Sequence, residues 1–321
     1  MQISFLLTTA YKKYILKCNI SPAKGTAFTM ANGYKSVKNP ATIKAQIEKL
    51  RSRGCIIEDE ERAKFVLENV NYYRLVHYFS PFLENKGRYR EGTTFEKVMR
   101  IYDFDRLLRS LILTVLEEVE ISMRAHVSNF HALKYGALGY LNESCFDNRH
   151  HNHKHFLGKI DRLVETNTGE ELVTHHMRKY GGAFPLWVIM ELFSFGMLNT
   201  FYSDLKTDDK KAIADKAFAI PYRCVEDWLY CLSDLRNMCA HYNRLYANKM
   251  NSIPKQPPDF YRPMNDTLYD HIIILKELFP RDDTWRTTFI MRLEMLFMEY
   301  GDVIELEHIG FPKNWREELV R

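Results

Sequence analysis

An arginine, an asparagine and a histidine lie close together in the segment LRNMCAHYNRL, residues 235–245. Asn237 follows Arg236 directly, and four residues separate Arg236 from His241. A histidine can move protons near neutral pH, and a guanidinium can bind a pentacoordinate phosphorus group in bidentate fashion. The amide can orient either group. These three residues are therefore candidate catalytic residues for phosphodiester cleavage in RNA, a reaction for which this set requires no metal ion.

The expected geometry of this segment leaves a second interpretation open. On an ideal helix Asn237 and His241 share one face, whereas Arg236 points about 140° away from His241. The long arginine side chain could still reach the same space near a fraying helix end. The alternative is a surface arginine with a histidine that faces the helix dipole.

Spacing alone also does not single out this segment. Arg124 with His131 and Arg149 with His155 are comparable pairs. A short arginine–histidine spacing is a weak motif in a chain of this size.

Hydrophobic periodicity predicts helices along nearly the whole chain, so we expect an all-α fold. The longest run opens at Thr94 and continues for about 40 residues to roughly Lys134, before Gly136. A second strong helix, residues 221–245, opens at Pro221 and carries the candidate site. Its predicted apolar face consists of Val225, Trp228, Leu229, Leu232, Leu235 and Cys239.

Capping residues and turn signals predict the shorter helices. Thr42 caps a helix that ends at Gly54, and Asp59 caps the next, with Phe65, Val66, Val70 and Tyr73 on one face. Residues 81–93 read as a loop. Further helices are predicted at 153–166, 169–180, 185–205 (broken near Gly196), from Asp208 or Asp209, and at 266–279, 283–299 and 313–320.

Other polar residues have a structural and a functional interpretation. Glu120 and Arg124 form an i, i+4 pair that favours an ion pair over a phosphate contact. Asp234 could orient the histidine or the arginine. The segment Tyr72, Tyr73, Arg74 favours packing over base stacking. The run His150, His151, His153 and His155 favours a solvated loop over a metal site, because no cysteine or carboxylate framework completes a tetrahedron.

Six longer blocks of sequence carry a resemblance to a known family. They are NPATIKAQIEKLRSRGCII (39–57), NVNYYRL (69–75), FEKVMRIYDFDRLLR (95–109), EEVEISMR (117–124), PLWVIMELFSFGMLNTFYSDL (185–205) and LRNMCAHYNRL (235–245). In this order and spacing the chain resembles the Abi-like abortive-infection family, the AbiD and AbiF group, over about residues 38–250. Its members look like ribonucleases with a HEPN domain. Their Arg-Asn-…-His block maps onto Arg236, Asn237 and His241, and Tyr242 stands where many relatives have a second histidine.

The resemblance implies a multi-helix HEPN-like bundle with additional helices at both ends. We expect residues 1–35 to be an N-terminal extension or tail, 36–250 the helical domain, and 251–321 a helical extension packed on it. The predicted function is a metal-independent endoribonuclease of an abortive-infection or toxin–antitoxin system. The alternative is a HEPN-like module that binds RNA or protein without cutting. Arg124, Arg244 and Tyr242 are the predicted RNA-binding residues. We expect a homodimer, an RNA or protein antitoxin and no cofactor.

Composition bounds these expectations. The chain has 321 residues, of which 46% are hydrophobic, which excludes a disordered chain or a disulfide-stapled miniprotein. The net charge of +4 is too mild to indicate a nucleic-acid binder by itself. Six cysteines without a CxxC motif predict free buried thiols. No stretch is apolar enough for a membrane span, so we expect a cytoplasmic protein without a membrane partner.

Overall fold

The predicted all-α fold is confirmed by a computed structural model that describes residues 39–84, 87–147, 149, 151–260 and 262–320. These residues form helices, turns and a few isolated β-bridges, without a strand among them. The predicted extension at residues 1–35 lies outside the described residues.

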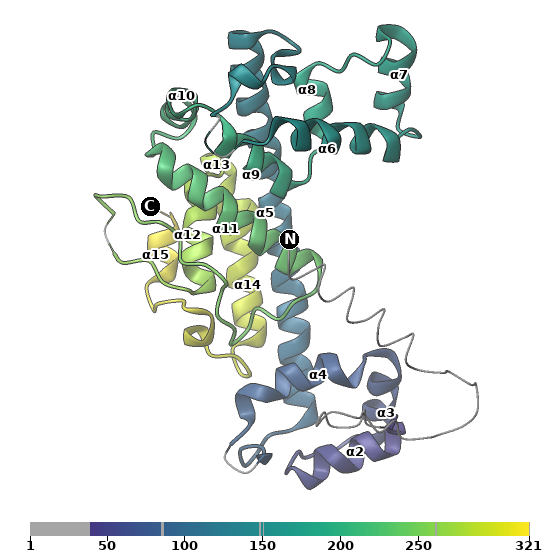
Figure 1. Ribbon diagram of the computed structural model, residues 1–321. Coiled ribbons are helices and arrows are strands. Elements are labelled where there is room, and N and C mark those ends of the chain that lie inside the picture. The colour runs from purple at the N-terminus through teal and green to yellow at the C-terminus, as the bar shows by residue number, and fades with distance from the viewer. Residues whose placement is uncertain (1–38, 85–86, 148, 150, 261, 321) are drawn as a thin grey trace, which may run out of the picture.

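Helix α5 (Phe95–Tyr135) is the axis of the molecule (Figure 1). It has 41 residues, about 60 Å at the α-helical rise. The Thr94 hydroxyl accepts the Lys97 N–H at its start, and Gly136, at φ +86°, ends it. Both predicted ends are therefore confirmed.

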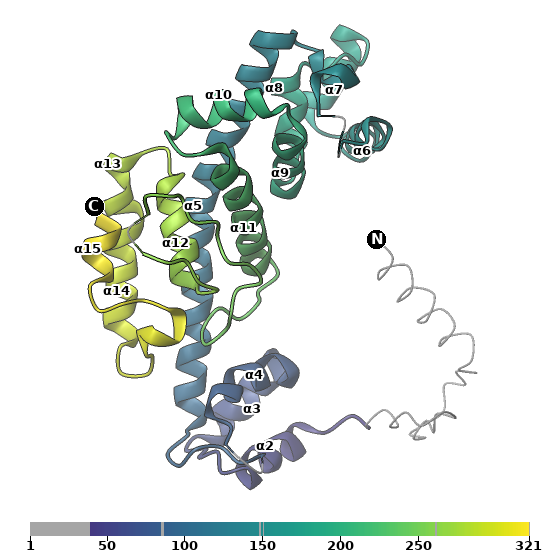
Figure 2. The same ribbon diagram turned by 60° about the vertical axis from the view of Figure 1, so that its left-hand side comes forward.

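Helices α2 (Ile43–Ser52), α3 (Glu60–Asn69) and α4 (Tyr72–Phe79) lie at the N-terminal end of α5, and α4 packs on it (Figures 1 and 2). Thr42 and Asp59 cap the first two helices as predicted. The predicted apolar face is wrong for Phe65 and Tyr73, whereas Val66 and Val70 pack against the core as predicted. The Asn71 side chain accepts the Tyr73 N–H and starts a new helix, so the earlier periodicity does not continue. Phe65 and Tyr73 are exposed.

A second group of helices lies at the other end of α5. It contains α6 (His153–Thr166), α7 (Glu171–Tyr180), α8 (Leu186–Ile189), α9 (Phe195–Asp204) and α10 (Thr207–Ala217), with short 3₁₀ turns at Gly139–Leu141, Glu143–Cys145 and Met190–Leu192. Of these helices, α8, α9 and α10 contact α5. The predicted break within 185–205 falls just before Gly196. Ser194 causes it, because its hydroxyl accepts the Met197 N–H and caps α9.

Helices along the middle of α5 complete the core. These are α11 (Tyr222–Ala240), α12 (Leu268–Glu277), α13 (Asp282–Trp285), a π-helical turn at Arg286–Ile290, α14 (Met291–Tyr300) and α15 (Trp315–Val320), with a 3₁₀ turn at Leu306–Ile309. Helices α11 and α14 pack directly on α5, and α12 packs on both α11 and α5. The helices after residue 251 thus share the core of α5, although the predicted domain boundaries stay a prediction.

Helix α11 runs antiparallel to α5. Lys134 near the C-terminal end of α5 pairs with Asp209 on α10, which precedes α11. Arg109, in the first half of α5, donates to the Asn243 carbonyl just after α11. The C-terminal end of α11 therefore lies beside the N-terminal half of α5 and close to α4.

Most cysteines of the chain are confirmed as buried free thiols. Cys55, Cys145, Cys224, Cys231 and Cys239 are buried and unpaired, whereas Cys18 lies outside the described residues.

One buried histidine should make the fold sensitive to acid. His131 on α5 is fully buried among Tyr135, Phe146 and Phe201, and neither ring nitrogen has a hydrogen-bond partner among the described residues. Burial lowers its pKa to about 4. The unfolded chain therefore binds this proton more readily, so stability falls as the pH drops from about 6.5 towards 4.

We expect this one group to lower the free energy of unfolding by about 2 kcal/mol between pH 7 and pH 5. Urea unfolding followed by circular dichroism at both pH values measures the loss. His131→Leu removes the titrating group and should flatten this part of the pH dependence. The same pH dependence in His131→Leu as in the parent would contradict the assignment.

Candidate functional site

Helix α11 presents the candidate residues because its opposite face is buried. The six residues of its predicted apolar face are all buried, as expected. Arg236 is therefore left partly exposed and Asn237 exposed. Cys239, within the same segment, is buried, and burial raises its pKa to about 12, so it is an un-ionised thiol at neutral pH.

The helix ends earlier than predicted. It stops at Ala240, and His241 is the C-cap residue. The Tyr242 N–H donates to the Cys239 carbonyl (3.1 Å) and the Asn243 N–H to the Met238 carbonyl (2.9 Å), which is the hydrogen-bond pattern of a Schellman motif. Tyr242 occupies the left-handed position of this motif, at φ +60°, where glycine is usual.

The three predicted catalytic residues lie at this helix end. The Arg236 guanidinium lies 3.4 Å from the Asn237 side-chain oxygen, and the Asn237 carbonyl accepts the His241 N–H at 2.9 Å. The His241 side chain is exposed and has no hydrogen-bond partner within the described part of the chain. An accessible cation, amide and imidazole thus share the last turn and cap of one helix.

The two competing pairs differ from this arrangement. His131 is enclosed in the core, so the pair with Arg124 has no accessible imidazole. Arg149 is engaged in an ion pair with Asp147, while His155 is exposed on α6. Arg236 has no ion pair with any carboxylate of the described residues, which leaves its charge available to a ligand.

Arg124 lies apart from this helix end. Its guanidinium pairs with Glu120 and donates to the Phe193 carbonyl at 2.7 Å. The ion-pair interpretation is therefore confirmed. Arg124 lies 15 residues beyond Arg109, about 22 Å further along α5. Arg124 thus lies away from the cluster around His241, and its role in RNA binding stays a prediction.

Asp234 does not contact the candidate histidine. Its carboxylate accepts a hydrogen bond from the Asn251 amide at 2.8 Å and thereby holds the loop after α11.

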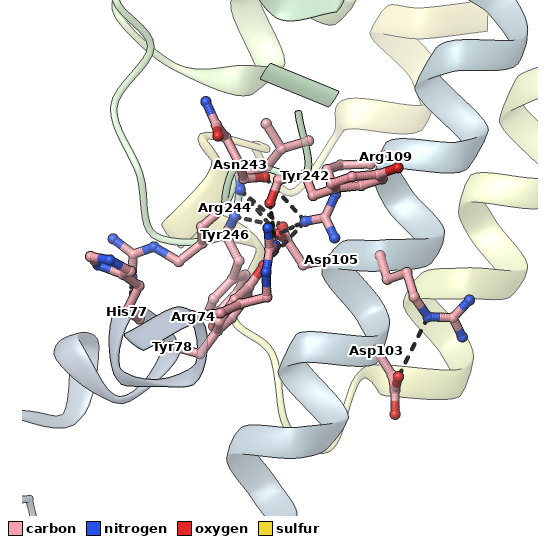
Figure 3. Close-up of polar contacts among 12 residues, drawn as sticks. Arg74, His77, Tyr78, Asp103, Asp105, Arg109, Tyr242, Asn243, Arg244 and Tyr246 are labelled. Carbon is pink, nitrogen blue, oxygen red and sulfur yellow. Dashed lines mark hydrogen bonds and ion pairs between the residues drawn. The ribbon is translucent and has the colours of Figure 1, made fainter. Parts of the chain in front are cut away.

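A buried carboxylate on α5 fixes the chain that follows His241 (Figure 3). Asp105 accepts the backbone N–H groups of Leu245 (3.1 Å) and Tyr246 (2.8 Å) and the Tyr78 hydroxyl (2.7 Å), and it pairs with Arg109. Burial raises the pKa of Asp105, while Arg109 and the three hydrogen bonds favour its ionised form. Arg109 also donates to the Asn243 carbonyl at 3.1 Å.

Sequence reasoning missed Asp105 and Arg109, although both lie in the block FEKVMRIYDFDRLLR. A signal was present: they form an i, i+4 acid–base pair on the same helical face as Ile101, Leu108 and Ile112. A charged pair on an apolar face indicates a buried polar anchor.

Helix α4 also contacts the segment that follows His241. Arg74 donates to the Tyr242 carbonyl at 2.7 Å, and its guanidinium carbon lies 5.7 Å from the Tyr242 ring centre. Arg244 donates to the His77 carbonyl (2.8 Å) and to the Ser80 hydroxyl (3.1 Å). Both cations are thereby fixed at the junction of α4 and α11.

A hollow of about 480 Å³ lies at this junction, and we call it the α4 hollow. It is lined by aromatic, cationic and amide side chains, chiefly Tyr73, Arg74, His77, Tyr242, Arg244 and Asn248. Of the predicted RNA-binding residues, Tyr242 and Arg244 belong to it. The packing interpretation of Tyr73 is wrong, because 72% of this residue is exposed.

The histidine run does not form a solvated loop throughout. His151 is buried, with Nδ1 2.8 Å from the Asp204 carboxylate, Nε2 3.1 Å from His153 Nδ1, and its ring stacked on Phe146. The solvated-loop interpretation is thus wrong for His151, and His150 lies outside the described residues. Among the residues that the structure describes, no group of three or more His, Cys, Asp or Glu side chains is arranged to hold a metal ion.

The fold and this site define an all-α protein with an exposed Arg-Asn-His cluster at the end of a core helix. The family model described as "Abi-like protein" matches residues 65–247, which is more than half of the chain. The chain therefore belongs to the Abi-like protein family, which associates it with abortive infection, a form of phage defence. The block at 39–57 lies outside this match.

No curated protein and no solved structure matches the chain significantly. No helix in the described ranges is long and apolar enough to cross a membrane.

Removal of the buried anchor should destabilise the protein strongly. In Asp105→Ala the Arg109 charge and two backbone N–H groups lose their partner, so we expect the free energy of unfolding to fall by roughly 3–5 kcal/mol. Urea unfolding followed by circular dichroism measures it. Asp103→Ala is the matched control, because Asp103 forms an exposed pair with Arg106 on the same helix, worth less than about 1 kcal/mol. An equal decrease in the free energy of unfolding in the two variants would contradict the role of Asp105 as a buried anchor.

The left-handed backbone of Tyr242 predicts an unusual response to substitution. Tyr242→Gly relieves a backbone cost of roughly 1–2 kcal/mol but loses the contact of the ring with Arg74, worth about 0.5–1 kcal/mol. We therefore expect Tyr242→Gly to be at least as stable as the parent in urea unfolding, and Tyr242→Val to be less stable than either. A glycine variant less stable than the valine variant would contradict this account of the helix end.

Proposed function

We propose that the protein is a metal-independent endoribonuclease of HEPN type, acting in an abortive-infection or toxin–antitoxin system. The observation that carries the proposal is the exposed cluster of Arg236, Asn237 and His241 at the end of α11, in a chain of the Abi-like family. The resemblance of its Arg-Asn-…-His block to the HEPN signature supports the same activity.

The chemistry uses the 2′-hydroxyl of the RNA as the nucleophile. A base removes the 2′-hydroxyl proton, the 2′-oxygen bonds to the adjacent phosphorus, and the bond from phosphorus to the 5′-oxygen breaks. An acid returns a proton to that 5′-oxygen. The products are a 2′,3′-cyclic phosphate and a 5′-hydroxyl end.

Each residue of the cluster has a role in this scheme. His241 transfers a proton as general acid or base, because its imidazole is accessible. Arg236 stabilises the negative charge on the phosphorane oxygens. Asn237 positions the Arg236 guanidinium, which its side-chain oxygen already contacts.

A symmetric homodimer would supply a second proton-transfer group. The motif provides one histidine per chain, whereas the reaction needs both a base and an acid. A two-fold axis near the end of α11 would bring a second Arg236–His241 set to the first. An RNA or protein antitoxin would restrain such a toxic enzyme in the cell.

A second candidate is a non-catalytic module that binds RNA or a partner protein in phage defence. The α4 hollow favours it, because this hollow offers cations and exposed tyrosines that bind without any proton transfer.

Cleavage of RNA by purified variants decides between the two. The parent, incubated with total RNA in the presence of EDTA, should give fragments with cyclic-phosphate ends. We expect His241→Ala and Arg236→Ala each to lower the cleavage rate by at least about 100-fold and to abolish cell toxicity. Arg236→Lys keeps the charge but not the bidentate geometry, so it should retain only part of the activity.

His155→Ala and Arg178→Ala serve as controls, because both residues are exposed on helices distant from the cluster. Their cleavage rates should equal that of the parent. Cleavage at the parent rate by both His241→Ala and Arg236→Ala would contradict the assignment of these catalytic residues. RNA binding by the parent without any cleavage would favour the binding module.

A further inference from the structure

The α4 hollow has a lining whose chemistry is specific. Its side chains are two tyrosines, two arginines, a histidine and three asparagines, with Tyr78 and Met238 at its base. No carboxylate lines it in the described part of the chain, although 41 acidic residues occur in the sequence. Such a lining suits a ligand that is both planar and anionic.

The two tyrosines are mostly exposed to solvent. Tyr73 on α4 is 72% exposed and Tyr242 is 65% exposed. Tyr242 holds its place at a backbone cost, since its φ of +60° is one that favours glycine. Exposed aromatic faces next to cations are typical of single-stranded nucleic-acid sites.

Neither cation of the hollow forms an ion pair within the described part of the chain. Arg74 and Arg244 donate to backbone carbonyls and a hydroxyl, and no carboxylate of the described residues lies within ion-pair distance of either. Burial lowers the pKa of Arg244, which stays charged at neutral pH. A partly desolvated, unpaired guanidinium binds an incoming phosphate more strongly than a solvated one.

The asparagines complete the set. Asn243, Asn248 and Asn251 line the hollow, and the amide nitrogen of Asn251 is already oriented by Asp234 at 2.8 Å. Amides offer a donor and an acceptor side by side, which matches the edge of an unpaired base.

We propose that the α4 hollow binds one unpaired nucleotide of single-stranded RNA next to the cleavage point. The base stacks on Tyr73 and Tyr242, the asparagines contact its edge, and Arg74 and Arg244 bind the adjacent phosphate. The catalytic candidates Arg236, Asn237 and His241 do not line the hollow, but Tyr242 follows His241 directly, so a nucleotide held there lies next to the residue that carries the imidazole. The proposal rests on the proposed ribonuclease function for its substrate class and adds a binding site that requires α4.

A binding experiment that does not depend on cleavage tests it. The full-length protein is titrated into a short labelled single-stranded RNA of mixed sequence with 2′-O-methyl riboses, and fluorescence anisotropy gives the Kd. The methyl groups remove the 2′-nucleophile, so no cleavage occurs. We expect Tyr73→Ala and Tyr242→Gly each to weaken binding by roughly 10-fold, and Tyr73→Phe, which keeps the stacking face, to bind within about twofold of the parent.

Matched controls separate the hollow from the rest of the surface. Tyr230→Ala removes a tyrosine that is 57% exposed on α11 but does not line the hollow, and it should bind like the parent. The same RNA annealed into a duplex hides its base faces, so its affinity should not change in Tyr73→Ala. Arg74→Gln should weaken binding of the single strand and reduce its dependence on salt.

Three results would overturn the proposal: no binding of the single strand by the parent, equal Kd values for Tyr73→Ala and the parent, or a loss in Arg74→Gln with none in the tyrosine variants. The last pattern identifies a general anion site, as an acidic peptide would use. Cleavage of unmodified RNA by the parent is measured separately. If the parent cleaves RNA but the tyrosine variants bind as well as the parent, the nucleotide site is rejected and the ribonuclease function stands. If the tyrosine variants bind more weakly but the parent does not cleave RNA, the ribonuclease function is rejected and the nucleotide site stands.

Discussion

The burial of Asp105 is the constraint on which the site depends. Its carboxylate holds two backbone N–H groups of the chain after α11, the Tyr78 hydroxyl of α4 and the Arg109 guanidinium of its own helix. One group thus fixes α4, α5 and the end of α11 relative to one another. An ionised carboxylate in a core is costly unless it is fully partnered. Separating the three elements would leave Asp105 without its partners and would therefore cost much free energy.

This anchor explains how an exposed site is kept rigid. Arg236, Asn237 and His241 lie at a helix terminus, where fraying would normally let them drift. The Schellman hydrogen bonds end the helix at a defined residue, and Asp105 holds the chain beyond it. Helix α4 closes the other side through Arg74 and Arg244. The site is therefore accessible to a ligand while its backbone is held from three directions.

Local chemistry made much of the fold predictable from sequence. Thr42, Asp59, Thr94 and Gly136 mark helix ends by hydrogen bonds or backbone freedom within a few residues, and the structure confirms all four. The apolar face of α11 followed from its period. The exposure of Arg236 and Asn237 followed from that face.

Features set by distant contacts were not predictable in this way. No glycine follows the end of α11 at Ala240, so the sequence gives no local signal for it. Residues 242–246 after this end are held by contacts with Arg74 and Asp105, more than a hundred positions earlier. Tyr73 became exposed because Asn71 started a new helix. His151 was buried by Asp204 and Phe146, partners that no spacing rule connects to it.

The separation of 140 residues between Asp105 and Leu245 has a consequence for how the molecule is made. The ion pair of Asp105 with Arg109 lies within one helix and can form as soon as α5 does. Closing the loop to Leu245 requires the intervening helices to be synthesised and packed first, and contacts of such long range form late in folding. On a translating ribosome the helix that bears the anchor is thus complete well before the residues it holds emerge. The candidate site therefore assembles only after the residues that follow α11 have left the ribosome.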